Sequence, residues 1–432
     1  MNELLAIWSE WIKPSAGLPT VQWSILLALA AAAGHLVQRY TGLPKVIGYS
    51  VVGAFAGLAG FTGAIWPLQG TSLFLLELGV AVVLFEAGGR ISLRWFRHNP
   101  MVLVQSLAES TLTFIAVYWA LKLMGMRDAV AQPLALLAMA ASPAVLSRVL
   151  MDTRASGPVS ERAMVLSTMS TLYALTLCSA SAGMMSRGKQ VLTDISLSDT
   201  FYPVLVVLGL SVVVGAVLAL VLRTALRVMS PTSENTAILL LALIAAGAAL
   251  AAHFGGSAAL AALLGGMLLK QLNPRPWSWP RQMGTASSML TMLMFVLVSV
   301  VAAQADWAGP IAGLVLALIA ARAVAKITGV ALGNIGSGSS AKQALWVGCA
   351  LTPMSSVVLL LVSQFITASP TLGRQIASVA LPAILMMEIL GAVLTTLAIY
   401  RAGESSKPWP LSGLTAAPTT PSASSREPVH AS

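Results

Sequence analysis

Charged side chains inside long apolar stretches are the residues of this sequence with the clearest capacity for chemistry. Arg322 and Lys326 are four residues apart, which places both on one face of a helix. Glu109 and Glu388 lie near the middle of two other apolar stretches. A charge held at bilayer depth costs about 2.5–3.5 kcal/mol, so each needs a partner or a function. We expect Glu109 or Glu388 to pair with Arg322, and Glu109 or Glu86 to carry protons.

Residues with neutral side-chain oxygens, the serines and threonines, are the second group of candidate functional residues. The stretch VLSTMSTLYAL, residues 165–175, holds Ser170 and Thr171 and carries no charge. Hydroxyl oxygens beside free backbone carbonyls suit Na⁺ or K⁺, or the polar part of a small solute. The same residue types also let membrane helices pack closely, and this structural alternative stays open. The full set of candidate oxygens is Ser142, Ser170, Thr171, Thr352, Ser355 and Ser356.

Two prolines interrupt the apolar stretches that contain these hydroxyls. Pro143 lies in the middle of PLALLAMAASPAVLSRVL, and Pro353 lies in the middle of ALWVGCALTPMSSVVLLLV. Proline removes a backbone donor and breaks the helix before it, which frees carbonyls inside a bilayer. Broken helices at corresponding positions of two halves are typical of inverted-repeat transporters, where they form an ion site near the midplane. Ordinary proline kinks are the alternative.

The composition shows which elements must hold these residues. The chain has 432 residues, of which 57% are hydrophobic and 9% charged, against about 25% charged residues in soluble domains. Its apolar runs have the length that crosses a bilayer as a helix. We predict an all-α polytopic membrane protein, with an N-terminal segment (1–17), a transporter domain (18–401) and a disordered tail rich in Ser, Thr and Pro (402–432). The thirteen predicted spans are 18–38, 44–63, 71–89, 100–122, 129–151, 162–185, 200–225, 234–253, 256–272, 283–304, 308–332, 341–365 and 375–400.

The basic residues predict the orientation in the membrane. With the N-terminus outside, most Lys and Arg residues fall in inner loops, as the positive-inside rule requires. The C-terminus is then cytoplasmic, and we expect a bacterial inner membrane. The net charge of +10 thereby reflects topology rather than nucleic-acid binding. The two cysteines are far apart in the sequence, and no metal cluster, nucleotide loop or nucleophile constellation is present. We therefore expect no cofactor and no enzymatic activity.

Several segments, taken in order, resemble the monovalent cation:proton antiporter-2 family, a group of sodium/proton exchanger-like proteins. The quoted matches are TGLPKVIGYSVVGAFAGLAG, LELGVAVVLFEAGG, SPAVLSRVL, GGSAALAALLGGMLL, MFVLVSV, ARAVAKITG and LWVGCALTPMSSVVLLLVSQ. The resemblance runs from about residue 20 to 400. It implies thirteen spans with inverted repeats, and a six-helix core with two crossing broken helices. It also implies a panel that forms a homodimer, and exchange of monovalent cations for protons. A basic residue of the family's eleventh helix matches Lys326.

The sequence departs from that family at the residues that carry its exchange chemistry. The family's sixth helix carries a carboxylate, and the matching positions here are Ser170 and Thr171. A second acidic position in the twelfth helix matches neutral Ser355 or Ser356. The resemblance predicts a cation/proton exchanger that works by alternating access with an atypical Ser170/Thr171 site. Two alternatives stay open: an inverted-repeat carrier that holds a small organic anion with Arg322 or Lys326, and a non-transporting or channel-like descendant.

Overall fold

The structure is a computed structural model that describes residues 18–186, 197–229, 233–273, 281–305, 307, 309–354 and 356–407. The predicted N-terminal segment, residues 408–432 of the predicted tail, and Ser355 lie outside these residues. The helices are α2 (Leu18–Thr41), α3 (Lys45–Leu58), α4 (Gly70–Gly89), α5 (Leu93–His98), α6 (Pro100–Leu123), α7 (Asp128–Met139), α8 (Pro143–Thr153), α9 (Pro158–Met185), α10 (Leu197–Val228), α11 (Glu234–His253), α12 (Ala258–Leu272), α13 (Arg281–Ala303), α14 (Gly309–Leu332), α15 (Ala341–Ala350), α16 (Val357–Ala368) and α17 (Pro370–Arg401).

The predicted all-α membrane fold is confirmed. Each of the thirteen predicted spans corresponds to one helix or to one broken pair, with α7 and α8 in the fifth span and α15 and α16 in the twelfth. Nine of the described helices are long and apolar enough to cross a membrane, and α3, α7, α12 and α16 are shorter apolar helices. The short helix α5, between the third and fourth spans, is an addition to the predicted elements.

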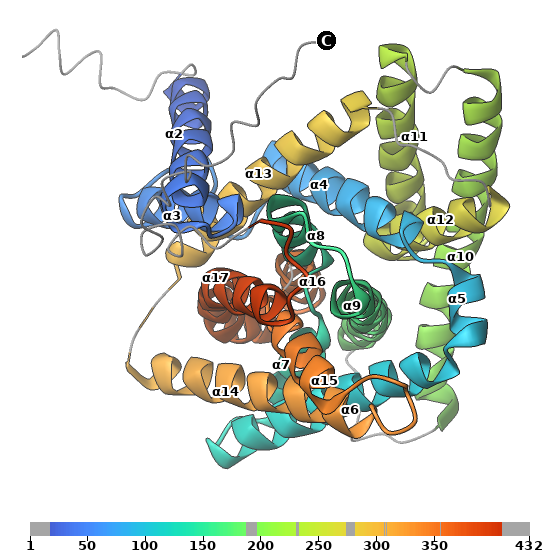
Figure 1. The fold of residues 1–432 in the computed structure, drawn as a ribbon. Coiled ribbons are helices and arrows are strands. Elements are labelled where there is room, and N and C mark those ends of the chain that lie inside the picture. Colours follow the sequence, from blue (N-terminus) through green and yellow to red (C-terminus); the bar gives the residue numbers. More distant parts are fainter. Residues whose placement is uncertain are drawn as a thin grey trace, which may run out of the picture.

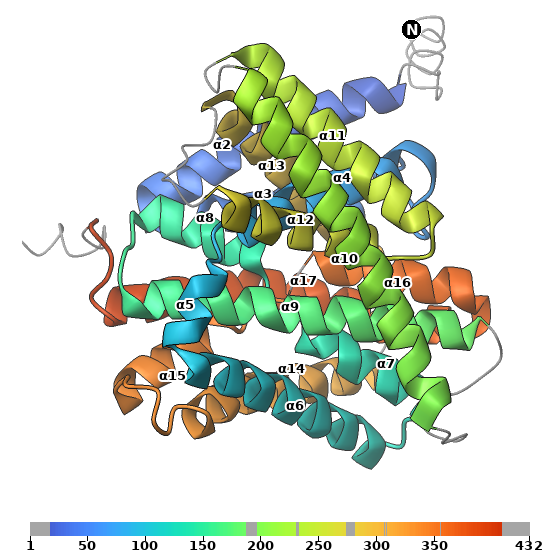
Figure 2. The same ribbon diagram turned by 90° about the vertical axis from the view of Figure 1, so that its right-hand side faces the viewer.

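The helices form two layers with a central group between them. Figures 1 and 2 show α8, α9, α16 and α17 in the middle, with α6, α7, α14 and α15 on one side. The panel on the other side consists of α2, α3, α4 and α10 to α13. Large apolar side chains such as Leu123, Val213 and Val324 are exposed on α6, α10 and α14. Such a surface is suited to lipid rather than water.

The packing inside the panel has the symmetry of an inverted repeat. The second span, α3, packs against the tenth, α13, and the third, α4, packs against the ninth, α12. If the second span is matched with the ninth and the third with the tenth, the contact of α3 with α13 corresponds to the contact of α12 with α4. Glycines allow both close approaches: a Cβ on Gly57 would lie 2.3 Å from the carbonyl oxygen of Val300, and one on Gly88 would lie 2.2 Å from that of Leu263.

Candidate functional site

The two breaks in the helices cross each other inside the protein. Residues 140–142 separate α7 from α8, and residues 351–356 separate α15 from α16. Ala141 and Met354 pair in an isolated antiparallel β-bridge, which joins the breaks through their backbones. The crossing places the C-terminal ends of α7 and α15 and the N-terminal ends of α8 and α16 in the interior. The predicted crossing of two broken helices is thus confirmed.

Serine and proline start the helix that follows the first break. Pro143 is the first residue of α8, where its missing N–H leaves no hydrogen bond unmade. The backbone N–H of Val145 donates to Ser142 Oγ at 3.2 Å, which caps the helix. Pro353 lies within the second break and starts no helix, because α16 begins four residues later at Val357.

Arg322 of α14 joins the two breaks through its guanidinium group. Its Nε donates to the carbonyl oxygen of Ala138, and its Nη2 donates to that of Ala140, both at 2.9 Å. It also donates to the carbonyl oxygens of Thr352 and, at 3.1 Å, Pro353. Carbonyls at helix C-termini carry partial negative charge, which stabilises a nearby cation. The expected carboxylate partner is therefore replaced by backbone: among the described residues Arg322 forms no ion pair, although it is completely buried.

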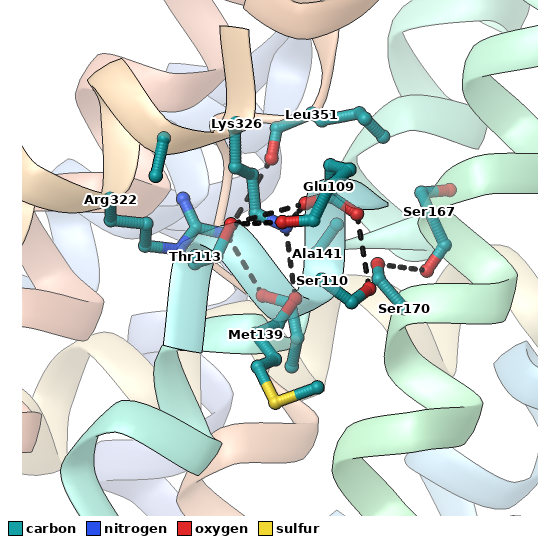
Figure 3. Close-up of polar contacts among 12 residues, drawn as sticks. Glu109, Ser110, Thr113, Met139, Ala141, Ser167, Ser170, Arg322, Lys326 and Leu351 are labelled. Carbon is teal, nitrogen blue, oxygen red and sulfur yellow. Dashed lines mark hydrogen bonds and ion pairs between the residues drawn. The ribbon is translucent and has the colours of Figure 1, made fainter. Parts of the chain in front are cut away.

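Lys326, one turn further along α14, forms the buried ion pair of the site. Its Nζ donates to the Glu109 carboxylate and, at 2.9 Å, to the carbonyl oxygen of Met139, the last residue of α7 (Figure 3). The hydroxyl of Ser110 donates to the other oxygen of this carboxylate at 3.2 Å, and Thr113 Oγ1, which donates to the backbone carbonyl of Glu109 at 2.8 Å, lies 3.5 Å from Oε1. Both charged side chains are fully buried. Glu109 is thus the partner of Lys326 rather than of Arg322, and both its oxygens are partnered.

Ser170 and Thr171 lie on α9, at different distances from the crossing. Thr171 Oγ1 contacts the carbonyl oxygens of Ala141 in the first break, at 2.8 Å, and of Ser167 one turn back, at 2.7 Å. Ser170 Oγ donates to the carbonyl oxygen of Ser167 at 3.1 Å. Both side chains are completely buried. A hydroxyl that donates to a carbonyl keeps lone pairs that can accept or bind a cation.

The remaining hydroxyls of the predicted site also contact their surroundings in the protein. Thr352 Oγ1 donates to the carbonyl oxygen of Cys349 at 2.7 Å, and Ser356 Oγ lies 3.3 Å from Met294 Sδ on α13. Ser355 lies outside the described residues. The structure thus brings Thr171, Arg322 and Lys326 together at the two breaks. Of the candidates on other elements, Glu109 joins them and Glu86 does not.

Glu86 belongs to a separate cluster at one end of the panel. Arg90 donates to one Glu86 oxygen at 2.7 Å, and the Ser287 hydroxyl donates to the other at 2.8 Å. Arg90 and Glu86 are partly exposed, as is usual for an ion pair near a helix end, whereas Ser287 is buried. A small pocket of about 30 Å³ is lined by Glu86, Ser287 and Arg148, among other residues.

Glu388 has polar neighbours that its own stretch of sequence does not reveal. The Ser299 hydroxyl of α13 donates to Glu388 Oε2 at 3.1 Å, and the Ser50 hydroxyl of α3 is beside the same carboxyl group. One turn along α17, Gly391 lies against the second break, because a Cβ there would be 2.5 Å from Pro353 Cα. The neighbours come from distant helices, so no local pattern in the sequence could have indicated them.

Two cavities approach the central residues of α9 from opposite ends of the helix. One, of about 360 Å³, is lined by residues of α4, α9 and α16, including Glu77, Ser179 and Gln364. The other, of about 380 Å³, is lined by residues around the starts of α5 and α9, including Ser156 and Glu161. Ser170 and Thr171 lie between the two groups of lining residues along α9, and neither side chain is exposed.

A comparison with known protein families identifies the family that has this arrangement. Residues 25–400 match the family model described as sodium/hydrogen exchanger, transmembrane. The chain belongs to this exchanger family. Its family and fold are those of secondary transporters rather than enzymes, and the predicted resemblance is confirmed. The chain is therefore an integral membrane protein, and its family supports cation/proton exchange. No curated protein matches the chain by sequence.

Solved structures share the fold of this exchanger-family protein. A structure of the sodium proton antiporter MjNhaP1 from Methanocaldococcus jannaschii at pH 8 matches with a TM-score of 0.63 and 16% identity, over 89% of this chain and 98% of that one. An electron-microscopy structure of the same antiporter matches with a TM-score of 0.58 and 17% identity, over 94% of this chain and 96% of that one. At these identities the likeness concerns the fold alone.

Proposed function

We propose that the chain exchanges a monovalent cation, Na⁺ or K⁺, for protons by alternating access. The observation that carries the proposal is the crossing of two broken helices inside an exchanger-family fold, with Thr171 in contact with the first break. Freed carbonyls and hydroxyls at such a crossing are ligands that can replace the hydration shell of a monovalent cation. The proposed site consists of Ser142, Pro143, Ser170, Thr171, Thr352, Pro353, Ser355 and Ser356.

The charges around the crossing give Arg322, Lys326 and Glu109 their proposed roles. Arg322 offsets the two negative helix ends, those of α7 and α15. Lys326 and Glu109 neutralise each other, so we propose that they are charge partners that hold α6, α7 and α14 in place. We propose that Glu86 and Arg90 are likewise charge partners with a structural role, because they form an ion pair and Glu86 lies apart from the crossing.

The two cavities support alternating access. Each reaches toward the middle of α9 from one end, and the buried Ser170 and Thr171 separate them. Both cavities lie where the panel meets the central helices. Movement of the central group against the panel would widen one cavity while it narrows the other, which is the exchange of access that a carrier needs.

Transport in vesicles tests the proposal. The full chain is reconstituted with a pH-sensitive dye inside, and Na⁺, K⁺ or Li⁺ is added outside. We expect cation-dependent proton efflux that is at least tenfold weaker in Thr171→Val, which keeps the shape and removes the oxygen. The control is Thr328→Val, since Thr328 makes the same kind of bond one turn back on α14 but faces outward. Wild-type vesicles that give no signal with any cation would refute the proposal.

A second candidate function is the transport of a small organic anion. The N-terminal ends of α8 and α16 each carry roughly +0.5 charge, and the family's helix-six acid is absent at Ser170 and Thr171. This charge would favour an anion at the crossing. Uptake of labelled small carboxylates by the same vesicles, without cation-dependent proton efflux, would favour this function. The absence of both signals would favour a non-transporting descendant.

The assembly and orientation remain predictions. We propose a homodimer formed through the panel, with the N-terminus outside and the C-terminus cytoplasmic in a bacterial inner membrane. The support is the resemblance for the dimer and the distribution of Lys and Arg for the orientation. Mass measurement in detergent and protease accessibility of the C-terminal tail would test each point.

A further inference from the structure

We propose that Glu388 is the carboxyl group that carries the exchanged proton, in place of the acid that α9 lacks. This inference rests on the proposed exchange function. Glu388 lies near the middle of α17 and is 1% exposed. Its helix packs against α3 and α13 of the panel, and the partner hydroxyls Ser50 and Ser299 come from these two helices. The group is therefore located where the central helices meet the panel.

No charge in the described part of the chain compensates Glu388. The helices that pack against α17 are α3, α7, α8, α13, α14, α15 and α16. None of their described ionisable side chains forms an ion pair or a hydrogen bond with Glu388, nor do those of α17 itself. The ionisable side chains in question are Lys45, Tyr49, Asp128, Arg148, Asp152, Arg322, Lys326, Lys342, Cys349, Arg374, Tyr400 and Arg401.

Glu388 Oε1 and Ser50 Oγ together form a place where a proton can be held. Glu388 Oε1 and Ser50 Oγ are both buried and have no hydrogen-bond partner among the described residues. A carboxylate and an unpaired hydroxyl oxygen are each costly to bury in this way. A proton on Glu388 Oε1 would remove the carboxylate charge and supply a donor for Ser50 Oγ, while the Ser299 hydroxyl continues to donate to Oε2. The same neighbours thus suit both forms of the group: when ionised it can accept from the Ser50 and Ser299 hydroxyls, and when protonated it can donate to Ser50 Oγ.

The position of Glu388 connects this proton to the candidate cation site. Gly391, three residues along α17, lies against Pro353 in the second break. The second break is bridged to the first at Ala141, and Thr171 contacts the carbonyl of that residue. Loss of the proton places a negative charge one turn from the crossing, where the N-terminal ends of α8 and α16 leave excess positive charge. Deprotonation of Glu388 would therefore favour entry of a cation into the crossing. Release of the proton is thereby coupled to binding of the cation, as exchange requires.

Infrared spectroscopy of the reconstituted full chain tests the protonation directly. The C=O stretching band of a protonated carboxyl group appears in acid-minus-alkaline difference spectra. We expect a band from a buried group that is absent in Glu388→Gln and present in Glu77→Gln, whose carboxyl group lies in a cavity on α4. In Ser50→Ala the band should shift, because the proton loses its acceptor. A band that persists in Glu388→Gln overturns the proposal.

Transport measurements test the coupling. We expect cation-dependent proton efflux in Glu388→Gln to fall to the level of empty vesicles, and to be retained in Glu388→Asp with a shifted pH profile. Glu234→Gln, at the exposed start of α11, serves as the control. Full efflux with an unchanged pH profile in Glu388→Gln overturns the proposal. If Glu388→Gln does not fold, Ser50→Ala and Ser299→Ala decide, and an unchanged band and pH profile in both overturn it.

The two proposals fail in different ways. A wild-type chain that gives no efflux with any cation, but shows the Glu388 band, refutes the exchange function and the coupling role while the protonated carboxyl group stands. A wild-type chain with efflux, whose band and pH profile are unaffected by Glu388→Gln, refutes the inference alone.

Discussion

At the scale of single residues, the pair of Lys326 and Glu109 shows how a buried charge is tolerated. Both side chains are fully buried, and each contacts further polar groups besides its partner. Removing one partner of such a pair leaves an uncompensated charge, which costs about 3–5 kcal/mol, whereas replacing both by apolar residues is often neutral. The pair therefore stabilises one arrangement of α6 and α14 only when it is complete.

We predict that Glu109→Leu and Lys326→Met each lower the stability by about 3–5 kcal/mol, and that the double variant recovers most of this loss. The reason is that the double variant removes both charges of the pair together and leaves neither uncompensated. Thermal unfolding in detergent, followed by the loss of the folded peak in size-exclusion chromatography, would measure the three variants. Additive losses in the double variant would show that the two residues act independently.

The glycine that lets α14 approach Glu109 gives a second prediction at this scale. A Cβ on Gly329 would be 2.6 Å from Glu109 Cα, whereas one on Gly313 of the same helix meets only Met124 Cε, at 3.5 Å. We expect Gly329→Ala to destabilise by about 1–3 kcal/mol through overpacking. Gly313→Ala, the matched control, should be neutral or stabilising, because alanine favours a helix by up to about 1 kcal/mol over glycine. Thermal unfolding distinguishes the two, and equal effects would contradict the packing argument.

At the scale of elements, one guanidinium group connects the end of α7 with both breaks. Arg322 reaches carbonyls of α7 and of both breaks, which no single ammonium group can do at once because it lacks the planar fork. We predict that Arg322→Lys lowers stability by at least roughly 2 kcal/mol, since it leaves buried carbonyls unpaired at about 1–3 kcal/mol each. Arg374→Lys, at an exposed position near the start of α17, is the control. Equal unfolding temperatures for the two variants would refute this role.

The elements also show how far sequence reasoning reaches. The spans and both breaks follow from apolar length and from Pro143 and Pro353, because backbone in a bilayer must satisfy its own hydrogen bonds. The partner of Arg322 could not be predicted, since backbone carbonyls leave no signature in the residue types. Glu388 could not be assigned either, because Ser50 and Ser299 reach it from spans distant in the sequence. Local pattern thus predicted the helices, and only tertiary packing revealed which polar groups meet.

At the scale of the whole molecule, the two cavities predict how access to α9 changes. Ser179 lines one cavity, Val165 lines the other, and the buried Ser170 lies between them. In a background with Cys178 and Cys349 replaced by alanine, we predict that Ser179→Cys and Val165→Cys react with a membrane-impermeant maleimide from opposite sides of the membrane. Ser170→Cys, the matched comparison on the same helix, should react far more slowly than either, because its side chain is buried between the cavities.

Alternating access makes the two reactivities change in opposite directions. A pH or cation gradient that shifts the central helices toward one side should speed the labelling of one cysteine and slow that of the other, because one movement opens one cavity and closes the second. Labelling rates in oriented vesicles, with and without Na⁺ or K⁺, would measure this. If each cysteine reacts from both sides, or if both rates rise together, the cavities belong to a continuous pore and the channel-like alternative is correct.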